Sequence, residues 1–480
     1  MNTAQIFSGE RKYKIALAVL IVGYITILTY ATFNKLNLFA MGFDLGMYEQ
    51  VIWNTAHGRW FATTAFAYTQ NHLGSDPILL EAILAPIYAI APTTYTMLFL
   101  QTVALGLAAV PIYLLAREKL GSPLAGVILG FCWLAYVPLS YLNLDEFQPR
   151  AFALPLAILA FYFLEKRRFL PFILSSVLML ATRSDVALFV IMLGIYALIS
   201  RKPKEFVIAP IIIGAAWFYL AVFVIVPRFK TTPGGFIYFE TYKWLGNSPG
   251  EMVVTIITRP LYVLENVLTP GKLRYLAQLF GPLGFLPLLR PDVLLLALPT
   301  LAFNLLSPQE LHWSIRYQYG SMIYPVSFCA TIMAIALLMK WKRLTARVEA
   351  RTILNSALGL LVVTTLASNL WLGNPALVWV TRQPNPRTAA AREVIAQVPP
   401  DVKLAASSLL APHVARREYF YFFPPHQFYT SNPVEVADYI LIDKRSDGDN
   451  PAVKKLLESG AWKVLFDKDD YMLVRRKALQ

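Results

Sequence analysis

Apolar segments of about twenty residues recur along this 480-residue chain between Tyr13 and Trp371. A helix of that length can cross the ~30 Å hydrocarbon layer of a bilayer. The chain is 57% hydrophobic and only 15% charged, a balance that excludes an ordinary soluble domain. We therefore expect an α-helical polytopic membrane protein.

The apolar pattern predicts about eleven transmembrane helices. The stretch 77–92 is also apolar but bounded by prolines, and we expect it to form a helix on the outer surface rather than a crossing. A crossing there would invert the side of every later loop. The predicted spans are 13–33, 93–116, 122–142, 150–164, 169–182, 185–200, 206–226, 273–289, 292–307, 318–339 and 352–372.

Basic residues are concentrated in alternate loops between these spans, which predicts that those loops are cytoplasmic. The protein would then be a multi-pass cell-membrane protein with a cytoplasmic N-terminus and an extracytoplasmic C-terminus. The net charge of +14 follows this topology, and nucleic-acid binding is not indicated. The basic segments are 11–14, 117–119, 166–168, 201–204, Arg290 and 340–351.

The sequence predicts two domains. Residues 1–372 are expected to form the transmembrane domain, including two long outer loops: the first outer loop at 34–92 and, as the second of the long ones, a Gly- and Pro-rich segment at 227–272 that could order over a substrate. Residues 373–480 change to a globular pattern and predict a small extracytoplasmic α/β domain. Its expected elements are helices at 387–398 and 451–459, strands at 402–407 and 437–443, and a hairpin of 462–466 with 471–475.

Charged side chains also gather at the outer ends of the spans. A bilayer protein that collects ionisable groups at one face usually handles a polar substrate there. Asp44 follows the first span by about a dozen residues, between Gly42 and Gly46, which let backbone approach closely. The other candidates are His72, Glu146, Arg150, Arg183, Asp185 and Arg316.

Several stretches resemble a prokaryotic family of predicted membrane proteins known as domain of unknown function 2079. That family is in turn similar to the GT-C glycosyltransferases, membrane enzymes that use polyprenyl-phosphate-linked sugars. The resemblance implies a GT-C-like transmembrane domain, a lipid-linked sugar donor and an acceptor that the sequence does not identify. The matching stretches are Phe43-Asp-Leu-Gly-Met-Tyr-Glu-Gln50, Asn71-His72, Glu146-Phe-Gln-Pro149, Arg183-Ser-Asp185, Arg316-Tyr-Gln-Tyr319, Ala411-Pro-His413 and Ala437-Asp-Tyr-Ile440.

Inverting sugar transfer needs a carboxylate that takes a proton from the acceptor hydroxyl. Asp44 fits this role by position, and the resemblance implies the same role; the alternative is that Asp44 merely caps a helix. Glu146 would bind a metal or acceptor hydroxyls, or would be a solvated loop charge.

The departing phosphate needs cations to hold it. Arg150, Arg183 and Arg316 offer guanidinium forks for its oxygens, although Arg183 and Asp185 could neutralise each other and arginines at span ends also reach toward lipid headgroups. His72 could orient phosphate or bind metal, or could be structural. No spacing defines a metal site, so a divalent metal stays an open alternative.

The leading hypothesis is an inverting GT-C-like glycosyltransferase acting on the outer face, with lipids and a lipid-linked sugar as partners. A transporter or lipid flippase is the main alternative, and it predicts polar residues and broken helices at mid-bilayer depth. A non-catalytic membrane scaffold is the third, and it predicts that the outer acids and arginines point apart.

Overall fold

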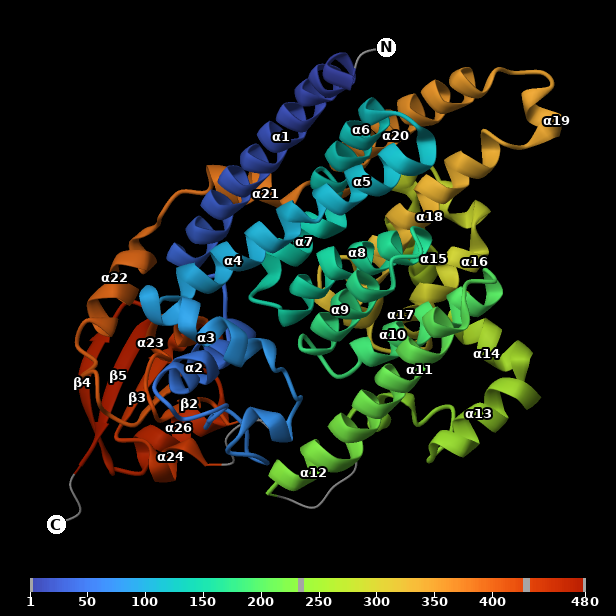
Figure 1. The fold of residues 1–480 in the computed structure, drawn as a ribbon. Helices are drawn as coiled ribbons and strands as arrows, with labels where there is room; N and C mark the ends of the chain where they lie inside the picture. Colours follow the sequence, from blue (N-terminus) through green and yellow to red (C-terminus); the bar gives the residue numbers. More distant parts are fainter. Residues whose placement is uncertain (1–2, 232–236, 426–431, 478–480) are drawn as a thin grey trace.

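The computed structural model describes residues 3–231, 237–425 and 432–477. Figure 1 shows a helical body with a small sheet domain at one end, and the N-terminus lies at the opposite end. The Gly- and Pro-rich stretch 232–235 of the second outer loop lies outside the described residues.

Long apolar helices are a main part of the helical body. Within the described residues, four stretches are long and apolar enough to cross a membrane: 10–37, 94–120, 204–229 and 350–372. A fifth, bent by 47°, consists of α6 (Pro123–Leu134) and α7 (Val137–Asp145). The four stretches contain α1 (Thr3–Asn37), α4 (Thr94–Leu107) with α5 (Ala109–Leu120), α11 (Lys204–Tyr219) with α12 (Val226–Phe229), and α20 (Ala350–Leu372).

The other expected spans correspond to shorter or interrupted helices. The predicted span 273–289 is helical only to Phe280, where the Gly281-Pro282 pair breaks it, because proline removes a backbone donor and clashes with the preceding turn. The shorter helices are α8 (Ala153–Glu165), α9 (Phe169–Leu180), α10 (Val186–Ile199), α15 (Pro270–Phe280), α16 (Pro291–Leu294), α17 (Leu298–Leu306), α18 (Ile323–Leu338) and α19 (Lys342–Thr345).

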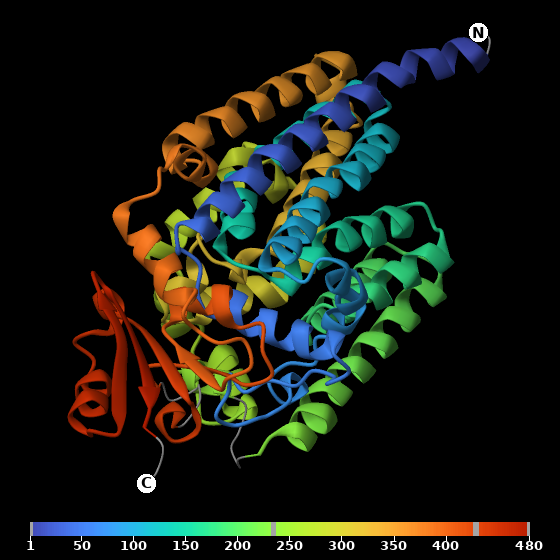
Figure 2. The ribbon, with the colours of Figure 1, turned by 90° about the vertical axis from the view of Figure 1, so that its left-hand side faces the viewer.

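The core of the helical body is built around α18. Most side chains of this helix are buried, on all of its faces, which is the pattern of a helix surrounded by others. Phe328 on α18 meets Trp133 on α6 edge to face at 5.1 Å, and Tyr324 meets Tyr136 at 5.5 Å. In Figures 1 and 2, α18 lies among the helices of the body.

The first outer loop contains two helices, α2 (Phe43–Ala56) and α3 (Leu80–Ile90), which pack against each other. The 11 residues of α3 extend about 16 Å, which is too short to cross a ~30 Å layer. One face of α3 is buried and the other exposes Ile83, Ile87 and Ile90. This amphipathic pattern agrees with the surface helix expected at 77–92.

The C-terminal domain is a five-stranded mixed sheet with strand order β2-β1-β3-β5-β4. Strands β2 and β3 both run parallel to β1, whereas β5 is antiparallel to β3 and forms a hairpin with β4. The strands are β1 (Leu404–Ala406), β2 (Phe420–Phe422), β3 (Tyr439–Asp443), β4 (Trp462–Lys468) and β5 (Tyr471–Arg476). The helices of this domain are α22 (Pro386–Ile395), α23 (Ala411–Val414), α24 (Pro433–Val436), α25 (Lys444–Asp447) and α26 (Pro451–Glu458), whereas α21 (Pro375–Thr381) packs against α1 and α7 of the helical body.

Every element expected in this domain is present within a few residues, whereas the short edge strand β2 and the four-residue helices α23, α24 and α25 were not predicted. The structure therefore confirms the fold class, a helical membrane protein with a small C-terminal sheet domain.

Helix α2 shares one hydrophobic core with the C-terminal domain, although about 350 residues separate them in sequence. The two glycines beside Asp44 make this contact close. A Cβ atom at Gly42 would lie 2.7 Å from the Ser408 hydroxyl, and one at Gly46 would lie 2.6 Å from the Ala411 Cβ. Figure 2 shows α2 between the sheet domain and the helical body.

We predict that Gly46→Ala lowers the melting temperature of the detergent-solubilised protein. A glycine-to-alanine change in a helix normally favours the helix, but this new methyl group would overlap Ala411, and overpacking costs about 1–3 kcal/mol. Gly359→Ala is the matched control, because nothing lies within 4 Å of its Cβ position on α20. Equal melting temperatures for the two variants would contradict the close contact.

Candidate functional site

Asp44 lies in the first turn of α2, and the N-terminus of this helix is capped by a residue from another segment. Gly42 itself provides no side-chain cap. Instead the Glu146 carboxylate accepts hydrogen bonds from the backbone N–H of Gly42 at 2.8 Å and of Leu45 at 2.7 Å. A carboxylate at a helix N-terminus is favoured by the free N–H groups and by the helix dipole. Glu146, expected to bind substrate or metal, thus positions α2.

Gln148 holds the Asp44 side chain directly. Its Nε2 donates to Asp44 Oδ2 at 2.8 Å, and Gln148 itself is buried. The backbone N–H of Gln148 donates to Gln101 Oε1 at 2.6 Å, and Gln101 Nε2 donates to the Glu146 carbonyl at 2.9 Å. The turn 146–149 is therefore anchored on α4 and fixes both the backbone and the carboxylate of Asp44.

Desolvation raises the pKa of the Asp44 carboxyl, while the hydrogen bond from Gln148 and the charges of Arg183 and His72 act in the opposite direction. A carboxylate with a raised pKa is a stronger base than one in water. Asp44 thus has the chemical environment of a general base, and Arg183 and His72 are the cationic groups whose charges act on it.

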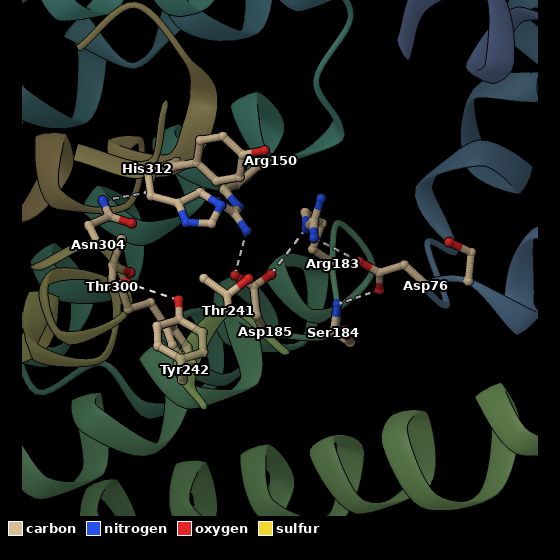
Figure 3. Close-up of a pocket in the computed structure, with 13 residues that line it drawn as sticks. Asp76, Arg150, Arg183, Ser184, Asp185, Thr241, Tyr242, Thr300, Asn304 and His312 are labelled. Carbon is tan, nitrogen blue, oxygen red and sulfur yellow. Dashed lines mark hydrogen bonds and ion pairs between the residues drawn. The ribbon is translucent and has the colours of Figure 1, made fainter. Parts of the chain in front are cut away.

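Alternating arginines and aspartates form a chain that begins near Asp44. Asp76 contacts Arg183 at 3.2 Å, Arg183 contacts Asp185 at 3.2 Å, and Asp185 contacts Arg150 at 2.5 Å. Figure 3 shows Arg183 between the two aspartates, with Arg150 on the far side of Asp185. These side chains come from the first outer loop, the N-terminal end of α10 and the turn before α8, so that three separate segments meet here.

This chain of charges lines a cavity of about 130 Å³. Arg150 is only 6% exposed, and its Nε is buried without a hydrogen-bond acceptor among the described residues. A buried unpaired donor is costly, so this group points to a ligand with an acceptor oxygen. The lining residues are Ser75, Asp76, Arg150, Arg183, Ser184, Asp185, Thr241, Tyr242, Thr300, Phe303, Asn304, His312 and Tyr319.

The opposite wall of the cavity carries neutral polar groups. Asn304 donates from Nδ2 to the Tyr275 hydroxyl at 2.9 Å and to the Tyr319 carbonyl at 3.2 Å. His312 Nδ1 lies 2.6 Å from the Ser307 hydroxyl, and burial lowers the pKa of His312. The cavity thus has a charged wall and a neutral hydrogen-bonding wall (Figure 3), as a ligand with both an anionic group and hydroxyls would need.

The structure brings together three of the seven predicted site residues, Arg150, Arg183 and Asp185, in the cavity lining. Asp44 lies next to this group but is not part of the lining. The convergence differs from the scattered arrangement expected of a scaffold.

Two further predicted residues lie elsewhere. His72 is buried 2.6 Å from Glu81, against the rings of Tyr48 and Phe66, and is not among the lining residues. Arg316 is exposed and is not among the lining residues.

Sequence reasoning did not assign a role to Gln148, Asp76, Asn304 or His312. The Glu146-Phe-Gln-Pro149 stretch contained Gln148, but nothing local indicates that its amide reaches a residue 104 positions away. Asp76 could have been suspected from its place in the first outer loop, whereas its pairing with Arg183 depends on the tertiary fold. Across the described residues, no group of three or more His, Cys, Asp or Glu side chains could hold a metal ion.

Comparison with solved structures identifies the architecture. The chain is similar to ArnT from Cupriavidus metallidurans bound to undecaprenyl phosphate, with 13% identity and a TM-score of 0.57 over 96% of this chain and 98% of that one. ArnT in the apo state matches with 14% identity and a TM-score of 0.59 over the same shares. These matches confirm the GT-C-like fold.

Comparison with curated proteins finds no match. The family model described as "Predicted membrane protein (DUF2079)" matches residues 35–473, nearly the whole chain and all of the candidate site. The protein is therefore a member of the DUF2079 family of membrane proteins.

Proposed function

We propose that the protein is an inverting glycosyltransferase that moves a sugar from a lipid-phosphate-linked donor to an acceptor hydroxyl at the outer face of the membrane. The observation that carries this proposal is the pair formed by the buried Arg150 and the half-buried Arg183, which converge on one cavity near the clamped Asp44 carboxylate. The GT-C-like fold supports the reaction class, and the undecaprenyl phosphate in the ArnT structure supports the class of donor.

In this mechanism Asp44 accepts the proton of the acceptor hydroxyl as its oxygen attacks the anomeric carbon. The bond between that carbon and the phosphate oxygen breaks, and the phosphate leaves with the electron pair. Arg150 and Arg183 stabilise the negative charge that grows on the phosphate. Asn304 and His312, on the neutral wall, would receive the sugar hydroxyls.

With the basic loops taken as cytoplasmic, the N-terminus would lie in the cytoplasm and the cavity and the C-terminal domain would both lie outside. The donor would then enter from the outer leaflet. No specific observation favours a flippase, because the ionisable residues within the interrupted segment 281–297, Arg290 and Asp292, pair with each other at 2.6 Å.

Replacement of the base tests the reaction. Asp44→Asn should reduce release of undecaprenyl phosphate from synthetic undecaprenyl-phosphate-linked sugars by at least about 100-fold, the contribution typical of a general base. Because Asn keeps the shape and accepts the Gln148 hydrogen bond, the melting temperature should change little. Asp401→Asn, an exposed change in the C-terminal domain, is the control. Full activity of Asp44→Asn would remove Asp44 from the mechanism.

The pH profile of activity tests whether Gln148 sets the pKa of Asp44 or has only a structural role. Activity requires deprotonated Asp44, so it falls as the pH drops through the raised pKa of this group. Gln148→Met removes a hydrogen bond that lowers the pKa of Asp44, and the acid limb should therefore move to higher pH. Gln50→Met is the control, because Gln50 is another buried glutamine and lies on α2. This variant should be destabilised without a shift of the acid limb. An unmoved limb in Gln148→Met would contradict the clamp.

Binding of undecaprenyl phosphate tests the phosphate site. The double variant Arg150→Gln with Asp185→Asn removes the ion pair without leaving a buried charge. The affinity of this double variant for undecaprenyl phosphate should fall by about tenfold or more, because a hydrogen bond to a charged group contributes about 1.5–3 kcal/mol. Arg316→Gln should bind as the unmodified protein does, since Arg316 is outside the cavity. Affinities would be measured by microscale thermophoresis in detergent. Weaker binding by Arg316→Gln than by the double variant would indicate that the phosphate binds at the Arg316 loop instead.

A further inference from the structure

Two short helices in the second outer loop expose an unusual amount of apolar surface. They are α13 (Pro249–Thr258) and α14 (Pro260–Val267). Ile257 is 72% exposed and Leu261 is 75% exposed. The further exposed large apolar side chains are Val253, Val254, Ile256, Tyr262, Leu264 and Leu268.

Water is an unfavourable environment for this surface. Between residues 251 and 268 the only charged side chains are Glu251, Arg259 and Glu265, and Arg259 lies at the junction of the two helices. Soluble surfaces rarely carry a contiguous apolar patch of this kind unless it has a partner. The partner must therefore be apolar.

The neighbouring elements indicate which apolar partner this is. Helix α14 packs on α17, whose Leu298 and Phe303 are also exposed. The long apolar stretch 204–229, which can cross a membrane, directly precedes the loop and is mostly not covered by protein. The apolar surface of α13 and α14 thus extends onto α17, and the stretch that precedes the loop is apolar and largely uncovered as well.

Length decides how the two helices can meet that lipid. The 10 residues of α13 and the 8 residues of α14 extend about 15 Å and 12 Å. Neither can cross a ~30 Å layer, but each fits within one leaflet, as amphipathic interfacial helices do. In Figure 1 both helices lie toward the end of the helical body that carries the sheet domain, away from the N-terminus.

We propose that α13 and α14 lie in the outer leaflet of the membrane, with Ile257 and Leu261 among the acyl chains. Arg259 extends from the helix junction toward the lipid headgroups. The partner of this surface is the lipid leaflet itself, and neither a second copy of the chain nor another protein is needed to cover it.

This placement also orients the candidate site. Tyr242, which lines the cavity, donates from its hydroxyl to the Phe303 carbonyl at 2.9 Å, and Trp244 donates from Nε1 to the Leu306 carbonyl at 2.9 Å. Trp244 also meets Tyr262 of α14 edge to face at 5.7 Å. One wall of the cavity is therefore fixed to the leaflet-bound helices. If the proposed function holds, the lipid chain of the donor approaches along this wall.

Depth-dependent fluorescence quenching tests the insertion without any assay of activity. Cys132→Ala and Cys329→Ala remove the two native thiols, and Ile257→Cys or Leu261→Cys then carries a bimane label in lipid nanodiscs. We expect strong quenching by lipids with a doxyl group on the acyl chain and little quenching by aqueous iodide. Val464→Cys, 46% exposed on β4 of the C-terminal domain, is the control and should show the opposite pattern.

Two outcomes would overturn the proposal. Quenching of the 257 and 261 labels by iodide to the same extent as the Val464 control would place α13 and α14 in water. Protection from both quenchers would mean that protein covers the surface, as in a dimer. A melting temperature close to that of the unlabelled protein ensures that either result reports on the folded state.

Discussion

The hydrogen bonds from the start of α2 to the Glu146 carboxylate position the first outer helix, and the arrangement around Asp44 depends on them. They join the end of the bent helix pair α6–α7 to the first outer helix, and α2 in turn packs against the C-terminal domain through its two glycines. Three regions distant in sequence are thereby fixed relative to Asp44. Without this cap, two N–H groups at the start of α2 would lose their acceptor, and the Asp44 carboxylate would no longer have a defined place.

The same contact sets the charge around Asp44. Burial and the nearby Asp44 charge raise the pKa of Glu146 to about 8, because two close carboxylates cannot both ionise readily in a poorly solvated site. The lysine and glutamine contacts around the turn, from Lys35 to the Leu144 and Asp145 carbonyls and from Gln148 to Asp44, complete the anchoring.

Sequence patterns predicted much of the fold and part of the site. Hydrophobic length located the long helices, and alternation located four of the five strands, because both are local properties. The predicted span 273–289 was too long, because its helix ends before Gly281-Pro282. An apolar stretch has the same composition whether or not its helix is broken. The edge strand β2 is three residues long and too short to give a pattern.

For the site, residue type and position at the span ends predicted Arg150, Arg183 and Asp185, because charges at a membrane face are few and their placement is constrained. The same reasoning selected His72 and Arg316. In the structure His72 pairs with Glu81 and Arg316 is exposed. This reasoning also predicted that Glu146 binds a metal or acceptor hydroxyls, and the fold shows that this carboxylate accepts hydrogen bonds from the start of α2. Only the tertiary structure distinguishes these roles, because each depends on which distant segment lies opposite the side chain.

The stereochemistry of the product tests the central claim most directly. The protein would be incubated with an undecaprenyl-phosphate-linked sugar of known anomeric configuration and a panel of acceptor alcohols, and the anomeric proton of the product would be read by NMR. A base-assisted direct displacement with Asp44 predicts the inverted anomer. A product with retained configuration would require a covalent intermediate and would contradict the account.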